Sequence, residues 1–155
     1  MSSVMGSVHV DLELENPVAP GQRRAVRSVL VDTGAELSWF PARVLESLGI
    51  ERSKLSRFRQ ATGAIVERWT GETRVYVAGT RTIDEVVFGE PNDLVLLGLR
   101  SLEGLNLTVD PVNRRLIDAG PAPAAHALQR STHRSLTWPT SSSTAASVRP
   151  DDLST

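Results

Sequence analysis

Residues 29–35 read Val-Leu-Val-Asp-Thr-Gly-Ala, three β-forming positions followed at once by an acid, a hydroxyl residue and a glycine. The apolar triplet predicts a strand that stops where Asp32 begins a turn. Asp32 can act as a general acid or base, and Gly34 allows a substrate to approach the backbone closely. The competing interpretation is an ordinary strand end, because Asp and Gly are common turn residues. The triplet alone does not decide between a site and a turn.

Two further motifs accompany this stretch in a definite order. Leu96-Leu97-Gly98 follows it, and Gln60-Ala61-Thr62-Gly63-Ala64 lies between them. With Val31 to Glu36, these segments resemble the active-site motif, the second aliphatic-glycine motif and the flap of the retropepsin-like aspartic proteases. The resemblance covers roughly residues 8–117. It implies an all-β fold, a small closed acid-protease barrel with one or two short helices, active as a homodimer.

The resemblance also implies a role for each matching position. Asp32 would be catalytic, Thr33 would hydrogen-bond across the dimer beneath the carboxylates, and Gly34 would offer its carbonyl to the substrate. Substrate contacts would come from two residues after the motif, Ala35 and Glu36, and from the flap residues Ala61, Thr62, Gly63 and Ala64. Leu97 and Gly98 would support the loop that holds Asp32.

One position departs from the family pattern. Leu99 follows Gly98, where an arginine that pairs with the acidic residue of the active-site loop is often found. Arg100 comes one position later, and the sequence does not decide whether it reaches Glu36. A solvated surface charge is the favoured interpretation of Arg100.

Peptide hydrolysis by carboxylates needs two acids in one site, one ionised to activate water and one protonated to hydrogen-bond the scissile carbonyl. This chain has one Asp-Thr-Gly. None of the other aspartates that follow it in the predicted folded part continues with Thr or Ser and then Gly; these are Asp84, Asp93, Asp110 and Asp118. We therefore expect a C2 homodimer in which two copies of Asp32 form the dyad.

The periodicity of the chain predicts short strands separated by glycine turns. Val8, Val10, Leu12 and Leu14 alternate with polar residues in a half-buried strand. Further strands are expected at 23–31, 55–60, 66–70, 72–77, 83–88 and 94–97, and a hairpin at 107–117. Short helices are expected from Pro41 to Gly49 and over 100–105.

Composition separates residues 1–119, the predicted protease domain, from residues 120–155. In the second segment 22 of 36 residues are Ser, Thr, Ala or Pro, so we expect a disordered tail. The start of the chain carries no secretory signal pattern and no apolar run of membrane-spanning length, so the predicted location is cytoplasmic, with no membrane partner.

Charge and reactive residues exclude several other classes. The chain has 17 basic and 18 acidic residues, a net charge of −1, and nothing that favours nucleic acid as a partner. It has no cysteine and only three histidines, so we expect no thiol chemistry, no serine triad, no metal and no cofactor. The predicted partners are a second copy of the chain and a peptide or protein substrate.

Three hypotheses remain open from the sequence. The preferred one is a dimeric aspartic endopeptidase. The second is a retropepsin-like binding or dimerisation module that cleaves little or nothing, and the third is an unrelated small β-domain in which Asp-Thr-Gly is only a turn.

Overall fold

The computed structural model describes residues 7–124. The helices and strands of the described residues lie in the first of two units, residues 1–120. The second unit, 121–155, falls almost entirely outside the described residues. The predicted disordered tail therefore lies largely outside what the structure describes.

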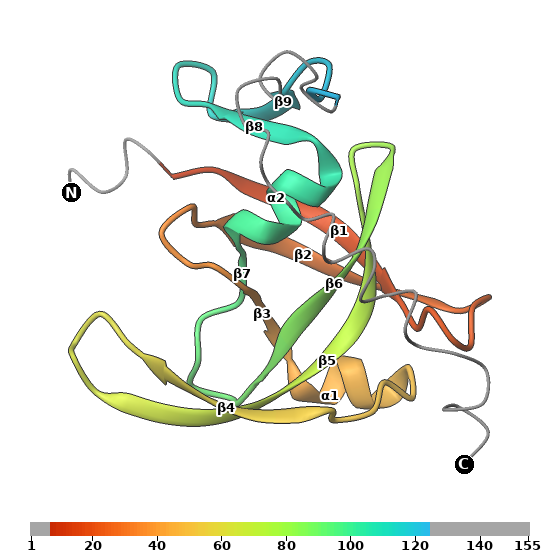
Figure 1. Cartoon of the computed structure of the whole chain (residues 1–155), viewed down its shortest axis with the longest axis vertical. Coiled ribbons are helices and arrows are strands. Elements are labelled where there is room, and N and C mark those ends of the chain that lie inside the picture. The colour runs from red at the N-terminus through yellow and green to blue at the C-terminus, as the bar shows by residue number, and fades with distance from the viewer. Residues whose placement is uncertain (1–6, 125–155) are drawn as a thin grey trace, which may run out of the picture. The chain divides into compact units, whose positions relative to one another are not determined.

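The fold is all-β with two short helices (Figure 1). In chain order the elements are β1 (His9–Glu15), β2 (Arg23–Val31), β3 (Ser38–Pro41), α1 (Ala42–Ser47), β4 (Lys54–Arg59), β5 (Ile65–Val77), β6 (Thr80–Gly89), β7 (Leu96–Leu97), α2 (Leu99–Leu105), β8 (Leu107–Asp110) and β9 (Arg115–Asp118). The predicted β-rich class is confirmed.

Seven strands form one sheet in the order β1-β2-β7-β3-β6-β5-β4, and β1 also pairs with β5. The extra pairing, Glu13 to Glu15 against Arg74 to Tyr76, closes the sheet into a ring. Closure removes free edges from the ring strands, but β4 lies outside it, paired with β5 alone. Figure 1 shows the β4–β5 hairpin extending to one side of the ring.

The core fills the ring with alternating strand residues, as the pattern of β1 predicts. Leu14, Val29 and Val75 are fully buried, and residues of both helices add to them. Leu45 comes from α1 and Leu102 from α2, so each short helix places an apolar face on the sheet. The core thereby holds β2 and β7 rigidly at the point where Asp32 emerges.

Several predicted boundaries were wrong. The strands expected at 66–70 and 72–77 are one strand, β5, that runs through Gly71. A side chain at Gly71 would meet the carbonyl oxygen of Glu51 at 2.5 Å, so this glycine permits close packing and does not end the strand. The strand expected at 94–97 is reduced to Leu96–Leu97, and β3 was not predicted at all.

Candidate active site

Asp32 is positioned by the pairing of two parallel strands. Val31, the last residue of β2, pairs with Leu97 of β7. The main-chain amide of Asp32 then donates to the carbonyl oxygen of Leu97 at 2.9 Å. Because both strands are core elements, the backbone of Asp32 has little freedom to move.

The loop after Asp32 folds back on the aspartate itself. The Gly34 amide donates to Asp32 Oδ1 at 2.9 Å, and the Ala35 amide donates to the Asp32 carbonyl at 3.2 Å. This is the Asx-type turn that favours Asp before Gly. Thr33 and Gly34 are exposed, and no ion pair neutralises the Asp32 carboxylate within residues 7–124.

Residues after β7 support the same loop from behind. The amides of Leu99 and Arg100 donate to the carbonyl oxygens of Ala35 and Glu36, at 2.8 and 3.0 Å. A Cβ at Gly98 would lie 2.6 Å from the Leu37 carbonyl group and 2.9 Å from the Ala35 oxygen. Only glycine allows this approach.

A buried chain of side-chain hydrogen bonds holds Gly98. Its amide donates to Ser38 Oγ at 2.9 Å, and the hydroxyls of Ser38 and Ser101 are 2.7 Å apart. Ser101 Oγ in turn donates to Asp84 at 3.3 Å. Both serines are fully buried, so each bond replaces a contact with water that is lost on folding. No sequence motif indicated these two serines.

The Asp32 loop and the predicted flap line the same cleft, with a volume of about 570 Å³. The predicted site residues that line it are Asp32, Gly34, Ala35, Ala61 and Thr62. Thr33, Glu36, Gly63 and Ala64 are not among its lining residues. Two motifs that are far apart in the sequence therefore meet across one concave surface.

The predicted flap tip, residues 60–64, is a tight turn between β4 and β5. The Gln60 amide donates to the Ala64 carbonyl and the Gly63 amide to the Gln60 carbonyl, both at 2.8 Å. Gly63 has φ +95°, which explains glycine at this position. Ala61 and Thr62 are exposed at the tip, on the side of the cleft.

An ion pair connects the flap strand to the opposite wall of the cleft. Arg68 of β5 donates to both carboxylate oxygens of Asp93, at 2.7 and 3.0 Å. Their side chains are 14% and 6% exposed. The hydrogen bonds from Arg68 lower the pKa of Asp93 below its usual range, although burial opposes this. Asp93 therefore stays ionised.

Sequence reasoning missed part of the cleft wall. Trp39, Arg59, Asp93, Leu94 and Leu96 line it. Trp39 packs edge-on against Phe58 with ring centroids 5.2 Å apart. Phe40, its neighbour, is fully buried in the core. The alternation of a strand sends these two side chains to opposite faces.

Arg100 does not pair with Glu36. Its guanidinium lies 3.4 Å from Asp84 and 3.9 Å from Glu85. Its main-chain amide donates to the carbonyl oxygen of Glu36 in the Asp32 loop. Its side chain pairs with two acids of β6.

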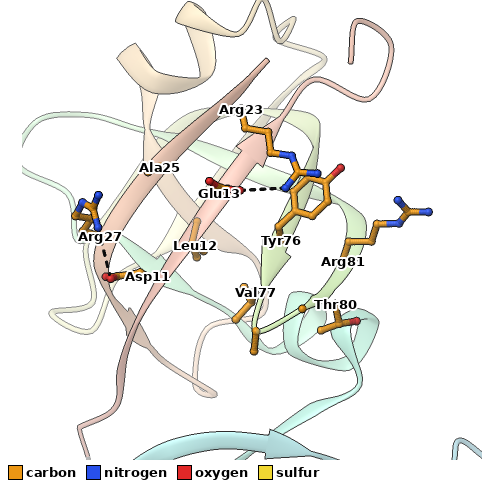
Figure 2. A pocket seen from close by; sticks show the side chains of 12 residues that line it. Asp11, Leu12, Glu13, Arg23, Ala25, Arg27, Tyr76, Val77, Thr80 and Arg81 are labelled. Atoms are coloured by element: carbon orange, nitrogen blue, oxygen red, sulfur yellow. Dashed lines mark hydrogen bonds and ion pairs between the residues drawn. The ribbon is translucent and has the colours of Figure 1, made fainter. Parts of the chain in front are cut away.

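A larger hollow, about 810 Å³, lies elsewhere, between β1, β2 and the β5–β6 turn (Figure 2). Its acids are already used: Glu13 pairs with Arg23 at 3.1 Å and Asp11 with Arg27 at 3.8 Å. Arg23 also lies over the ring of Tyr76, 3.6 Å from its centroid. Both carboxylates of this surface are therefore held in exposed ion pairs.

In the described part of the chain, no group of three or more His, Cys, Asp or Glu residues is placed to hold a metal ion. No described helix is long and apolar enough to cross a membrane. No protein-family model matches the chain, and no curated protein matches it.

Proposed function

We propose that this protein is a retropepsin-like aspartic endopeptidase that acts as a homodimer on a peptide or protein. The observation that carries the proposal is the common cleft of Asp32 and the flap tip. A carboxylate on a rigid loop faces a hairpin that can cover an extended peptide. An Asp-Thr-Gly that served only as a turn would not need this arrangement.

The reaction needs a second carboxyl group, and one chain does not supply it. Asp93 lines the same cleft, but Arg68 keeps it ionised and occupies both its oxygens. It therefore cannot be the protonated member of a dyad. The exposed loop at Thr33 and Gly34 leaves Asp32 accessible to the Asp32 of another copy.

In the proposed dimer the two Asp32 carboxyls share one proton, because like charges in contact cannot both ionise. The ionised member takes a proton from water, and the protonated member hydrogen-bonds the scissile carbonyl as the hydroxide adds to it. The hydrogen bond from Gly34 holds Oδ1 of each carboxylate in place. Collapse of the tetrahedral intermediate with protonation of the amide nitrogen releases the two products.

The other predicted residues keep supporting roles in this proposal. Thr33 would bond across the dimer, Ala35, Ala61 and Thr62 would contact the substrate, and Glu36 would lie at the cleft's margin. Leu97 and Gly98 would hold the loop, as their hydrogen bonds and close contacts favour.

The test is cleavage of a mixed peptide library across pH by the wild-type chain and by Asp32→Asn at equal concentration. Asparagine keeps the acceptor for the Gly34 amide, so the loop should remain folded. Cleavage by the wild type that disappears in Asp32→Asn would support the protease. If neither chain cleaves any peptide while sedimentation shows dimers, the peptide-binding module would be favoured and the proposed enzyme would be wrong.

A further inference from the structure

The free edge of β4 is a second feature of the fold with recognition chemistry, and it borders the Asp32 cleft through Arg59, which lines that cleft. β4 is the terminal strand of the seven-stranded sheet, bonded to β5 only. Its six residues, Lys-Leu-Ser-Arg-Phe-Arg, carry three cations and no acid. A strand edge offers unpaired backbone donors and acceptors to any extended chain that approaches it.

The hydrogen-bond pattern shows which backbone groups are free. The Gln60 amide donates to Ala64 of the neighbouring strand. Because such bonds alternate along an antiparallel pair, the amides of Leu55, Arg57 and Arg59 point away from β5, toward the open edge. The same three residues are exposed, whereas Ser56 and Phe58 on the other face are partly buried.

Side chains on the exposed face combine charge with apolar surface. Leu55 lies opposite Trp69 on β5, and the two side chains are 49% and 40% exposed. Arg57 and Arg59 form no ion pair within the described residues, and Arg59 only donates to the carbonyl oxygen of Gly63. The edge therefore presents two guanidinium groups that form no ion pair within residues 7–124, although Glu67 of β5 lies opposite Arg57 in the strand register, and beside them an apolar pair.

We propose that β4 binds an acidic, extended segment of another protein as an added strand. Arg57 and Arg59 pair with acids at alternate positions, and Leu55 with Trp69 packs against an apolar residue two positions further along. For a segment that runs antiparallel to β4, this gives the pattern acid-x-acid-x-apolar. Backbone bonds supply affinity, and the alternating side chains supply specificity.

The probe is a fluorescein-labelled peptide, Thr-Glu-Thr-Glu-Thr-Leu-Thr, with a matched peptide in which both Glu are Gln. Binding to full-length Asp32→Asn, chosen so that the peptide is not cut, is followed by anisotropy at low and high salt. The Gln peptide and the Arg57→Gln/Arg59→Gln variant should each bind about 2- to 30-fold more weakly, since an exposed ion pair contributes little and two are lost. High salt should reduce the difference in affinity between the Glu and Gln peptides, because it screens the ion pairs.

The matched control is Arg81→Gln, which removes an exposed arginine of β6 that lies away from this edge and has no ion pair with any residue of 7–124. It should bind like the parent chain. Amide hydrogen exchange by NMR supplies the second readout, in which Leu55, Arg57 and Arg59 should become protected on binding.

Equal affinity for the Glu and Gln peptides would overturn the proposal, as would protection confined to the Asp32 loop and flap tip. In either case the arginines act only as charged guards that keep the edge from pairing with other copies. Neither outcome depends on peptide cleavage, so the proposal stands or falls separately from the protease.

Discussion

The main-chain amide of Asp32 donates to the carbonyl oxygen of Leu97 at 2.9 Å. Strand β7 therefore fixes the position of the residue on which the proposed chemistry depends. The next residue, Gly98, extends this support through Ser38 and through close contact with Leu37. The site is thus held by β7 and by the buried end of β2, which position it more precisely than a loop alone would.

Gly98→Ala should destabilise the protein and disable the site. A methyl group would overlap the Leu37 and Ala35 carbonyls, which predicts a loss of about 1–3 kcal/mol in the free energy of unfolding. A displacement of the Asp32 loop by an ångström would reduce cleavage about 100-fold. Urea unfolding and peptide cleavage measure the two effects.

Gly79→Ala is the control for this substitution. Gly79 has φ +82°, and an added Cβ would meet no neighbouring atom. The substitution should therefore lower the free energy of unfolding only by the backbone penalty of about 1–2 kcal/mol. Its cleavage rate should match the wild type. Equal loss of activity in both variants would contradict a specific role for Gly98.

Ser38→Ala should lower the free energy of unfolding by about 1–3 kcal/mol, because it leaves the buried Gly98 amide without an acceptor and removes the partner of Ser101. Ser53→Ala, on an exposed residue ahead of β4, should change the free energy of unfolding by less than about 0.5 kcal/mol. Thermal or urea unfolding compares the two. A Ser38 variant as stable as the Ser53 variant would show that the hydroxyl chain is dispensable.

The Arg68–Asp93 pair should hold the flap strand to the opposite cleft wall. Arg68→Met leaves Asp93 without its cation and should cost about 1.5–3 kcal/mol. Arg68→Met/Asp93→Leu should recover part of this loss, because no charge is left unpaired. A double-mutant cycle measured by urea unfolding gives the coupling between the two side chains. A double variant that loses more free energy of unfolding than the two single variants together would contradict a stabilising pair.

Glu15 should make stability depend on acid pH. It accepts hydrogen bonds from the Tyr76 hydroxyl, the Gly21 amide and Arg74, which together lower its pKa from 4.5 to about 2. Because the pKa of Glu15 is lower in the folded than in the unfolded chain, its ionised form stabilises the fold. This contribution to stability is complete above pH 4.5 and disappears as the pH falls toward about 2. Unfolding measured across this range should show a steeper fall for the wild type than for Glu15→Gln.

Glu103→Gln, on the exposed side of α2, is the matched control and should follow the wild-type pH curve. If Glu15→Gln also followed that curve, the hydrogen bonds to Glu15 would not stabilise the folded state.

If the proposed enzyme is a dimer, inactive chains should also inactivate the wild-type chains with which they pair. Once wild-type and Asp32→Asn chains have exchanged in equal amounts, the activity per wild-type chain should fall by half, because half of its partners lack a functional carboxyl. A monomeric enzyme would keep its full activity per chain. Mixing at constant total concentration, with activity read after exchange, distinguishes the two.

Local patterns were sufficient for much of the architecture. The alternation at residues 8–15 predicts β1, and the strand ending at Asp32 and the glycine after Leu97 were both identified in place. Such features depend on periodicity and turn chemistry over a few residues, which a single sequence displays directly.

Other features depended on which segments meet in space. β3 is too short for a visible period and exists because β6 and β7 pair with it. Gly71 looked like a strand end but is a point of close contact with Glu51. Trp39 and Asp93 belong to the cleft only because β3 and the segment before β7 come together beside the flap.

By itself, then, the sequence determined a β-rich chain with Asp32 at a strand end and a flap-like turn at Gly63. Only the tertiary structure decided that β1 closes on β5, that Asp93 is neutralised by Arg68, and that the Asp32 loop shares a cleft with the flap. The reason is physical: turn and strand preferences act over neighbouring residues, whereas closure, ion pairing and cleft formation depend on contacts between residues far apart in the chain.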